Sequence, residues 1–307
     1  MRLQHILAAT DFSRPAEQAL DRAALLAAEH GAALELVFVG DQGRGQPTGP
    51  AERLAQRARQ LARRHRLPHV QALPLPAAGA GRARAVLDAA GQADLVVLDG
   101  DARAADRGLR PFRQLMALLQ LLRAARCPVL LVRRPAERPY AHVLVDARHD
   151  AGGALLRCAG GLQPRAALEL FHAAQPRGLR CRAAFERALR HPPAVPHAAL
   201  RELYVSDAFD ARRNRVDLAL RGADAVRQLA VQQHSVAADL VALAHRPRHP
   251  LLEGLRPGAV PRLLTGEAAV ACDVLVLPSA GRVGRPAPVP ARGPAQSAVA
   301  RRWTQAT

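Results

Sequence analysis

The stretch Asp94-Leu95-Val96 is followed 33 residues later by Cys127-Pro128-Val129-Leu130. The same spacing returns 145 residues further along the chain, from Asp239-Leu240-Val241 to Cys272-Asp273-Val274-Leu275. Self-similarity at an offset of nearly half the chain indicates one domain that is present twice. A length of 307 residues suits two domains of ordinary size, each able to bury its own core.

The first half alternates short apolar runs with segments of helical periodicity. Strands are expected over residues 5–9, 34–39, 69–73, 94–98 and 129–133, and helices over 15–30, 51–66, 82–90 and 111–125. Pro15 suits a first helical turn, and Gly31 suits the end of the first helix. Strands that alternate with helices of this length predict an α/β fold with a parallel sheet covered on both faces.

The second half repeats this order less regularly. Strands are expected at 142–145, near Leu168, at 216–220 and after Asp239 and Cys272, with helices over 151–160, 197–212 and 223–234. The predicted organisation is domain 1 at 1–135, a linker at 136–141, domain 2 at 142–279 and a tail at 280–307. The tail carries five Arg and no acid, a composition typical of disorder.

The composition bounds the function. Every one of the 44 basic residues is Arg, and the net charge of +18 favours an anionic partner such as nucleic acid. Aromatic residues make up only 3% of the chain, however, and RNA-binding modules normally use them for stacking. Nucleic-acid binding is therefore not the expected function, and the Arg side chains of the 51–66 helix are interpreted as a solvated outer face.

The cysteines and apolar runs indicate the compartment. Four Cys lie at positions 127, 158, 181 and 272 with no CxxC pair, so neither a zinc ribbon nor a redox motif is expected. Cys127 and Cys272 open apolar runs, which is typical of buried thiols in a reducing compartment. The dense apolar stretch at 115–122 is too short to span a bilayer, and no signal-peptide pattern opens the sequence. We expect a cytoplasmic protein that has no membrane partner.

The opening His5-Ile6-Leu7-Ala8-Ala9-Thr10-Asp11-Phe12-Ser13 resembles the first strand and turn of the universal stress protein family. The stretches 94–97 and 127–132 resemble its later strands, and the second half matches less closely through 142–145, Leu168, Arg221-Gly222 and 239–278. The resemblance implies two tandem five-stranded, parallel, Rossmann-like domains related to the adenine nucleotide alpha hydrolase fold. Family members commonly dimerise through the last strand, so it also implies either a homodimer or an intramolecular pseudo-dimer.

The resemblance further implies a nucleotide site in domain 1, if one is retained, formed by Thr10, Asp11, Val39 and Gly100. In nucleotide-binding members the Asp after the first strand contacts the nucleoside. A motif of Gly, two residues, Gly, nine residues, then Gly-Ser or Gly-Thr holds the phosphates through backbone N–H groups.

The phosphate motif is degraded in domain 1. Asp99-Gly100-Asp101-Ala102 stands in place of Gly-x-x-Gly, and Leu115-Met116 fills the Gly-Ser position. Asp99, Asp101 and Asp106 would repel a triphosphate, and no further ligands follow at the spacing of a metal loop, so no metal is expected.

Domain 2 differs in kind. Either Arg148 or Asp146 stands at the position of the first-strand Asp, and Gly258-Ala259 resembles a weakened Gly-Ser. After the fourth strand, a cationic loop carries His245, Arg246, Arg248 and His249. It lies at the carboxyl edge of a sheet, where ligands usually bind, so it is either a simple anion site or a solvated loop.

No catalytic constellation is found, and neither a Walker motif nor a dinucleotide fingerprint is present. The sequence therefore predicts a non-catalytic stress-response binding or regulatory module without a cofactor, whose protein partners are unknown. The alternative is a domain 1 that binds ATP or another adenine nucleotide through Asp11, with at most weak hydrolysis. A basic nucleic-acid-associated module is the third interpretation.

Overall fold

The computed structural model describes residues 3–40, 49–75, 81–100, 110–146, 153–171, 204–206, 225–245, 258–265 and 268–278. Domain 1 contains β1 His5–Thr10, α1 Arg14–His30, β2 Ala33–Phe38, α2 Pro50–His65, β3 Val70–Ala72, α3 Arg82–Ala89, the 3-10 turn η1 Ala90–Gln92, β4 Leu95–Asp99, α4 Arg110–Ala124 and β5 Val129–Val132. Domain 2 contains β6 His142–Asp146, α5 Ala154–Leu162, β7 Ala167–Phe171, β8 Tyr204–Ser206, α9 Ala225–Ser235, β9 Leu240–His245, α11 Ala259–Leu264 and β10 Asp273–Pro278.

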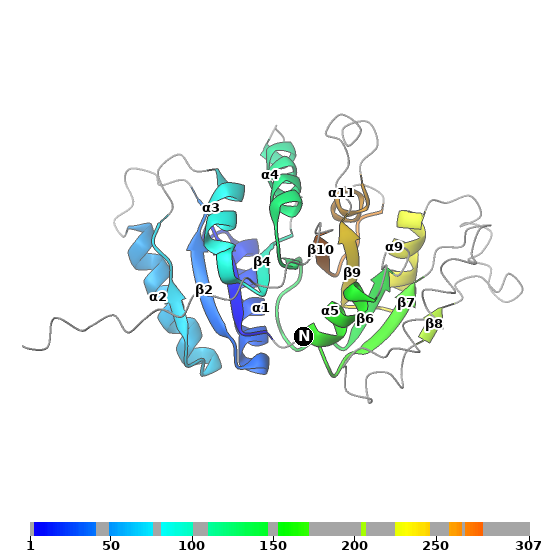
Figure 1. Ribbon diagram of the computed structural model, residues 1–307, viewed down its shortest axis with the longest axis horizontal. Helices are drawn as coiled ribbons and strands as arrows, with labels where there is room; N and C mark the ends of the chain where they lie inside the picture. The colour runs from blue at the N-terminus through cyan, green and yellow to red at the C-terminus, as the bar shows by residue number, and fades with distance from the viewer. Residues whose placement is uncertain are drawn as a thin grey trace, which may run out of the picture.

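All of these strands form one sheet in the order β3-β2-β1-β4-β5-β10-β9-β6-β7-β8 (Figure 1). The order of domain 2 mirrors that of domain 1, and neighbouring strands within each half are parallel. The two halves join antiparallel through their last strands, where Leu130 of β5 pairs with Leu275 of β10. The predicted α/β class is thus confirmed, and the two expected five-stranded sheets form a single intramolecular pseudo-dimer.

Helix α1 shows why the local sequence folds as it does. The Ser13 hydroxyl accepts a hydrogen bond from the Ala16 N–H at 3.4 Å and caps the helix start, where Pro15 lies in the first turn. Gly31 ends the helix in the left-handed conformation with φ of 64°, which a residue without a Cβ adopts at low cost. Small Ala side chains on the inner face let α1 pack closely on β1 and β4.

Most strands begin and end within two residues of their predicted bounds, but one element differs. The helix expected over 197–212 is wrong at Tyr204–Ser206, which form β8 and pair with β7. An aromatic and a β-branched residue favour a strand, and the edge of the domain 2 sheet offers β7 as a partner. The strand expected at 216–220 and the tail at 280–307 lie outside the described residues, and the domain boundaries stay a prediction.

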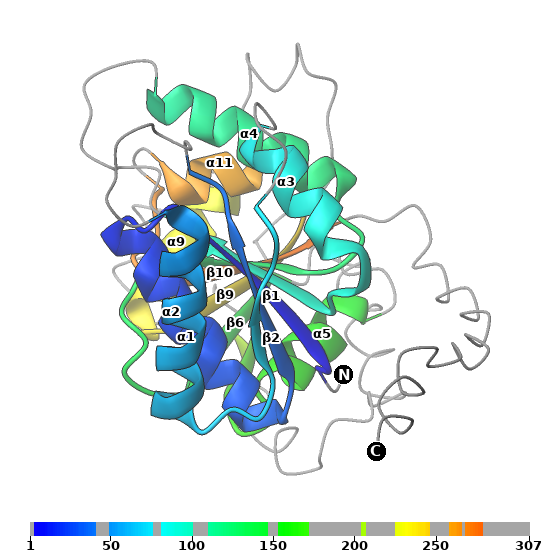
Figure 2. The same cartoon turned by 90° about the vertical axis from the view of Figure 1, so that its left-hand side faces the viewer.

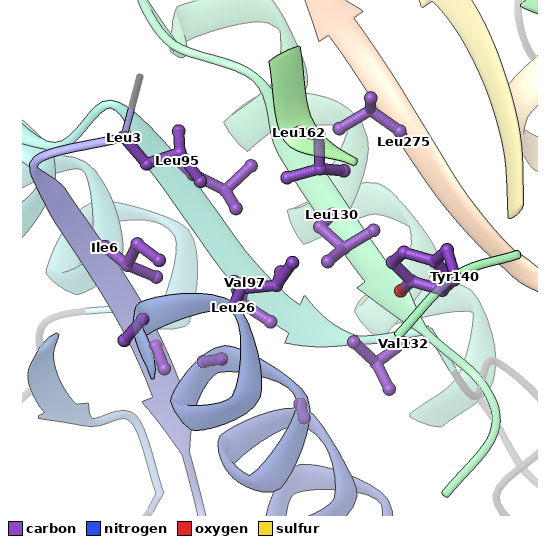
Figure 3. Packing of buried hydrophobic residues seen from close by; sticks show 14 of the residues in the cluster. Leu3, Ile6, Leu26, Leu95, Val97, Leu130, Val132, Tyr140, Leu162 and Leu275 are labelled. Atoms are coloured by element: carbon purple, nitrogen blue, oxygen red, sulfur yellow. The ribbon is translucent and has the colours of Figure 1, made fainter. Parts of the chain in front are cut away.

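The helices cover both faces of the sheet. One face packs against α1, α2 and α5, and the other against α3, α4, α9 and α11 (Figures 1 and 2). On the first face the core is continuous across the seam between the halves. Leu130, Leu162, Leu275 and Tyr140 meet there and extend the cluster that begins at Ile6 in domain 1 (Figure 3).

The repeated Asp-to-Cys spacing has a structural cause. The Asp94 carboxylate accepts hydrogen bonds from the N–H of His5 at 3.0 Å and of the residue before it at 2.7 Å. The Asp239 carboxylate does the same with His142 at 3.1 Å and the residue before it at 2.8 Å. Each Asp therefore fixes the start of its domain's first strand beside the fourth strand.

At the other end of the spacing, Cys272 is a buried core residue, and Cys127 is partly buried against the core. Burial, aided by the nearby Asp94 charge, raises the pKa of Cys127 to about 11. Burial and the neighbouring Asp273 raise the pKa of Cys272 to about 12. Both thiols are protonated at neutral pH, as expected for cysteines that contribute packing and not chemistry.

A buried carboxylate, Asp273, ties the two domains together at the seam. Its Oδ1 accepts hydrogen bonds from the backbone N–H groups of Arg133 at 2.7 Å and Arg134 at 3.1 Å. Its Oδ2 accepts the Tyr140 hydroxyl at 2.5 Å and lies 3.4 Å from Nε of Arg22. Asp273 thus joins β10 to helix α1 and to the segment between the domains. We refer to Asp273, Tyr140 and Arg22 as the seam triad.

All three residues of the seam triad are buried. Burial raises the pKa of the Asp273 carboxyl, opposed by the hydrogen bond from Tyr140 and the charge of Arg22. Burial also raises the pKa of the Tyr140 hydroxyl well above its usual value, with a further contribution from the Asp273 charge. The Arg22 guanidinium stacks 4.2 Å from the Tyr140 ring centre and donates to the Arg138 carbonyl at 2.7 Å. Each charge therefore has a direct partner.

Candidate functional site

The topology of domain 1 locates a crevice at the carboxyl edge of the sheet. Strand β1 lies between β2 and β4, so the strand order reverses at β1. Open α/β sheets bind ligands beside such a reversal, at the carboxyl ends of the strands. Thr10 and Asp11 follow β1, Val39 follows β2 and Gly100 follows β4. The structure therefore brings the four predicted nucleotide residues to one edge.

Thr10 and Asp11 shape the turn after β1. Thr10 is fully buried, and its hydroxyl accepts the Phe12 N–H at 2.9 Å, while its carbonyl accepts the Val39 N–H at 2.9 Å. The Asp11 carboxylate accepts the Ser13 N–H at 2.9 Å and is 28% exposed. Of these residues, Asp11 offers a charged group to the crevice.

Two stacked phenylalanine rings lie near Asp11, Phe12 directly after β1 and Phe38 at the end of β2. Phe12 has a left-handed backbone with φ of 63°, which costs a residue with a Cβ about 1–2 kcal/mol. Its ring stacks on Phe38 at a centroid distance of 5.1 Å, and the Arg53 guanidinium lies 4.2 Å above it. Ring stacking and cation–π contacts contribute about 0.5–1.5 and 0.5–1 kcal/mol respectively, enough to hold the turn.

Sequence reasoning missed Arg82, the first residue of α3. Its guanidinium forms a short ion pair with Asp99 at the end of β4 and lies 3.9 Å from the Asp11 carboxylate. Arg82 thus spans the crevice between β1 and β4. No sequence signal marks it, because only the fold brings positions 11, 82 and 99 together.

Gly100 faces the neighbouring strand. Its N–H donates to the Val132 carbonyl at 2.7 Å. A Cβ at this position would lie 2.7 Å from Cγ of Arg133 and 3.2 Å from the Leu131 backbone. The small residue therefore lets β4 pack against β5, and its N–H is already used within the protein.

A pocket of about 50 Å³ lies beside the Arg82–Asp99 pair, between α3, α4 and the end of β4. Its walls are mostly apolar and include Leu264 from α11 of domain 2. Leu115, which fills the Gly-Ser position of the family motif, lines the pocket from the middle of α4.

The equivalent edge of domain 2 carries two buried polar residues. Asp146 ends β6 and is 2% exposed, and His245 ends β9 and is 4% exposed. The strand registers make Asp146 equivalent to Ala9 and His245 equivalent to Gly100. His245, which the sequence placed in a loop, instead ends β9 and is buried, because the strand extends to it. Its predicted companions at 246, 248 and 249 lie outside the described residues. The anion site expected at this loop stays a prediction.

Comparison with known proteins identifies domain 1. The model of the universal stress protein family matches residues 2–133. Residues 2–133 belong to the universal stress protein family. Of the curated proteins compared with the chain, none matches it.

Solved structures extend the likeness to both halves at the level of the fold. A universal stress protein from Archaeoglobus fulgidus DSM 4304 superposes with a TM-score of 0.62 at 10% identity, covering 89% of this chain and 97% of that protein. A protein of unknown function from Pseudomonas aeruginosa PAO1 superposes with a TM-score of 0.53 at 19% identity, covering 90% and 92% respectively. The fold of this chain is therefore found in solved structures over about nine-tenths of its length.

Two further observations concern membrane spans and metal sites. Among the described helices, none is both long enough and apolar enough to cross a membrane. Within the described residues, no group of three or more His, Cys, Asp and Glu side chains is arranged to hold a metal ion.

Proposed function

We propose that this protein is a cytoplasmic, non-catalytic binding or regulatory module that has lost strong ATP binding. The observation that carries the proposal is Arg82, which lies across the crevice between Asp11 and Asp99. Arg82 already pairs with both carboxylates, so a nucleotide that used Asp11 would have to compete with this guanidinium for it. This competition supports the loss of strong triphosphate binding.

Gly100 supports the same proposal. A phosphate site at a strand end depends on free backbone N–H groups that point at the oxygens. The Gly100 N–H donates to the Val132 carbonyl, and its Cα packs against Arg133. A nucleotide would have to break this hydrogen bond to use the N–H.

One observation favours the alternative, an ATP-binding domain 1. The Asp11 carboxylate remains 28% exposed at an edge that also holds Thr10 and Val39. Such a carboxylate can accept hydrogen bonds from nucleoside hydroxyls.

Calorimetric titration with ATP separates the two functions. The wild-type protein is expected to show no binding with Kd below about 1 mM, which corresponds to about −4 kcal/mol. Asp11→Ala is compared with Asp88→Ala, which removes an exposed carboxylate of α3 instead. Micromolar binding by the wild type that survives Asp88→Ala but not Asp11→Ala would establish the alternative. Phosphate release from ATP above the buffer rate would contradict the absence of catalysis.

A further inference from the structure

Two exposed arginines of helix α2, Arg59 and Arg63, and a third at its C-cap, Arg66, lie at the outer end of domain 1 (Figures 1 and 2). Arg59 and Arg63 lie one turn apart at i and i+4, and Arg66 follows directly after the last turn. We call these three residues the arginine stripe. At a rise of 1.5 Å per residue the stripe is about 10 Å long.

The other arginines of α2 have partners within the protein. Arg57 pairs with Glu17 at 2.6 Å and with Asp21 at 3.0 Å, and Arg64 lies 3.5 Å from Asp21. Arg53 covers the Phe12 ring. In contrast, no ion pair joins a stripe arginine to any acid in the part of the chain that the structure describes. Residues 59–69 contain no acid at all.

The end of the stripe adds an independent observation. Arg66 caps the C-terminus of α2 in the left-handed conformation, with φ of 53°. Glycine is the usual residue here because a Cβ is disfavoured in this region. A charged side chain stands at this position instead, and it extends the stripe beyond the helix. A non-glycine residue in a disfavoured backbone conformation is a reason to look for a function of its side chain.

The chemistry of the stripe selects the partner. A helix that lies on a membrane needs an exposed apolar face, but Leu54, Ala58 and Leu61 are buried in the core. A protein interface relies on aromatic or aliphatic anchors, whereas the exposed neighbours of the stripe include Gln56 and Gln60. Guanidinium groups match phosphates bidentately, and a row of them fits a line of phosphates.

We propose that the arginine stripe binds the phosphate backbone of double-stranded nucleic acid without reading its sequence. With no aromatic side chain in α2, the contact uses charge and not base stacking. The inference goes beyond the proposed function and does not depend on whether the crevice holds ATP. The sequence alone indicated a solvated outer face for the arginines of this helix. The structure distinguishes the arginines that have partners within the protein from the three of the stripe.

The test uses the full chain and a fluorescein-labelled 20-base-pair DNA of mixed sequence, titrated by anisotropy at 50–200 mM salt. A duplex RNA of the same length, run in parallel, shows which nucleic acid binds more tightly. The stripe variant carries Arg59→Gln, Arg63→Gln and Arg66→Gln. The slope of log K against log salt is negative, and each lost phosphate contact reduces its magnitude by about 0.9. The triple change therefore reduces the magnitude by about 2.7. The ratio of the wild-type binding constant to that of the stripe variant therefore falls about 40-fold between 50 and 200 mM salt.

Two controls keep the outcome specific. Arg14→Gln, Arg126→Gln and Arg165→Gln remove the same charge from exposed sites on three separate segments, and this variant is expected to keep most of the slope. Arg66→Gly relieves the left-handed backbone, so it is expected to raise Tm by about 2 °C while reducing the magnitude of the slope by about 0.9. Loss of binding in a more stable protein excludes misfolding as the cause.

Three results would overturn the proposal. The slope of the stripe variant would equal that of the wild type if the contacts lay elsewhere, for example in the arginine-rich tail. An equal loss of slope in the control variant would show that the net charge of the protein, and not the arginine stripe, determines binding. Binding to vesicles that contain phosphatidylserine, without binding to either duplex, would replace nucleic acid by a lipid surface.

Discussion

The two last strands of the protein pair with each other, yet only one of them carries a buried charge. Domain 1 has Pro128 at the position before its last strand, and domain 2 has Asp273 at the equivalent position. In a symmetric dimer every contact at the shared strands occurs twice. Here the contacts of Asp273 with Arg22 and Tyr140 occur once. The two halves thus share the backbone pairing of their last strands, while the contacts of one residue make their association asymmetric.

The crevices of the two domains differ in a similar way. In domain 1, Arg82 spans the gap between carboxylates at the strand ends. In domain 2, the positions of Ala9 and Gly100 are taken by the buried residues Asp146 and His245. The sheet has stayed the same while the groups at its carboxyl edge have diverged, so the fold is informative about ancestry and the edge about function.

Removing the seam carboxylate should have the largest effect. Asp273→Ala leaves Arg22 and the Tyr140 hydroxyl buried without their acceptor, and breaking a buried ion pair costs about 3–5 kcal/mol. Urea denaturation of the variant measures the loss. Because an apolar replacement of both charged partners removes the uncompensated charge, Arg22→Met combined with Asp273→Leu should recover part of it. The rest remains lost because the donors of Arg133, Arg134 and Tyr140 still lack their acceptor. A loss below about 1 kcal/mol for Asp273→Ala would mean that the seam does not depend on the triad.

The two repeated aspartates allow the halves to be compared directly. Asp94→Ala and Asp239→Ala each remove hydrogen bonds to two backbone N–H groups, so each should cost about 1–3 kcal/mol of unfolding free energy. The asparagine variants should differ. Asp94 accepts both bonds on Oδ2, which an amide oxygen can replace, whereas Asp239 uses both oxygens.

Denaturation curves of the four variants test this difference. Asp94→Asn should be milder than Asp239→Asn, because the amide NH₂ in domain 2 would face a backbone donor. Equal losses for the two asparagine variants would contradict the hydrogen-bond geometry. A loss confined to one of the alanine variants would mean that the two aspartates do not have the same role.

Most of the fold was predictable from sequence because its signals are local. Apolar strand runs, the cap at Ser13 and Gly31 and the repeated spacing each involve neighbouring residues or a fixed offset. The strand Tyr204–Ser206 was missed because it is short, and its pairing with β7 is a tertiary contact.

The candidate site was predictable only in part. The resemblance implied a nucleotide site at Thr10, Asp11 and Gly100, and the fold brings these residues to one edge of the sheet, while their role stays a prediction. The resemblance gave no sign that the Gly100 N–H is already used. Arg82 had no signal, since it meets the carboxylates through tertiary structure alone. The seam had one usable signal, because aligning the two copies sets Asp273 against a proline, and a lone carboxylate in an apolar run requires a partner.

The smallest effect is expected at a pair found in domain 2 alone. His142 lies 3.2 Å from Glu169, and this hydrogen bond raises the pKa of His142 above its usual value. Domain 1 has His5 and Glu35 at the equivalent positions, but Glu35 accepts from Gln71 instead.

Because the pKa of His142 is higher in the folded state, the pair stabilises domain 2 fully below about pH 6.5. This contribution is lost as the pH rises through the folded-state pKa of His142, and it should amount to less than about 1 kcal/mol for a partly exposed pair. NMR titration of the His142 ring measures the pKa, and unfolding at pH 5.5 and 8 measures the energy. Glu169→Gln should lower the pKa and remove this part of the pH dependence, while Glu35→Gln in domain 1 should not. A His142 pKa at or below 6.5 in the wild type would show that the carboxylate contact does not outweigh the burial of the ring.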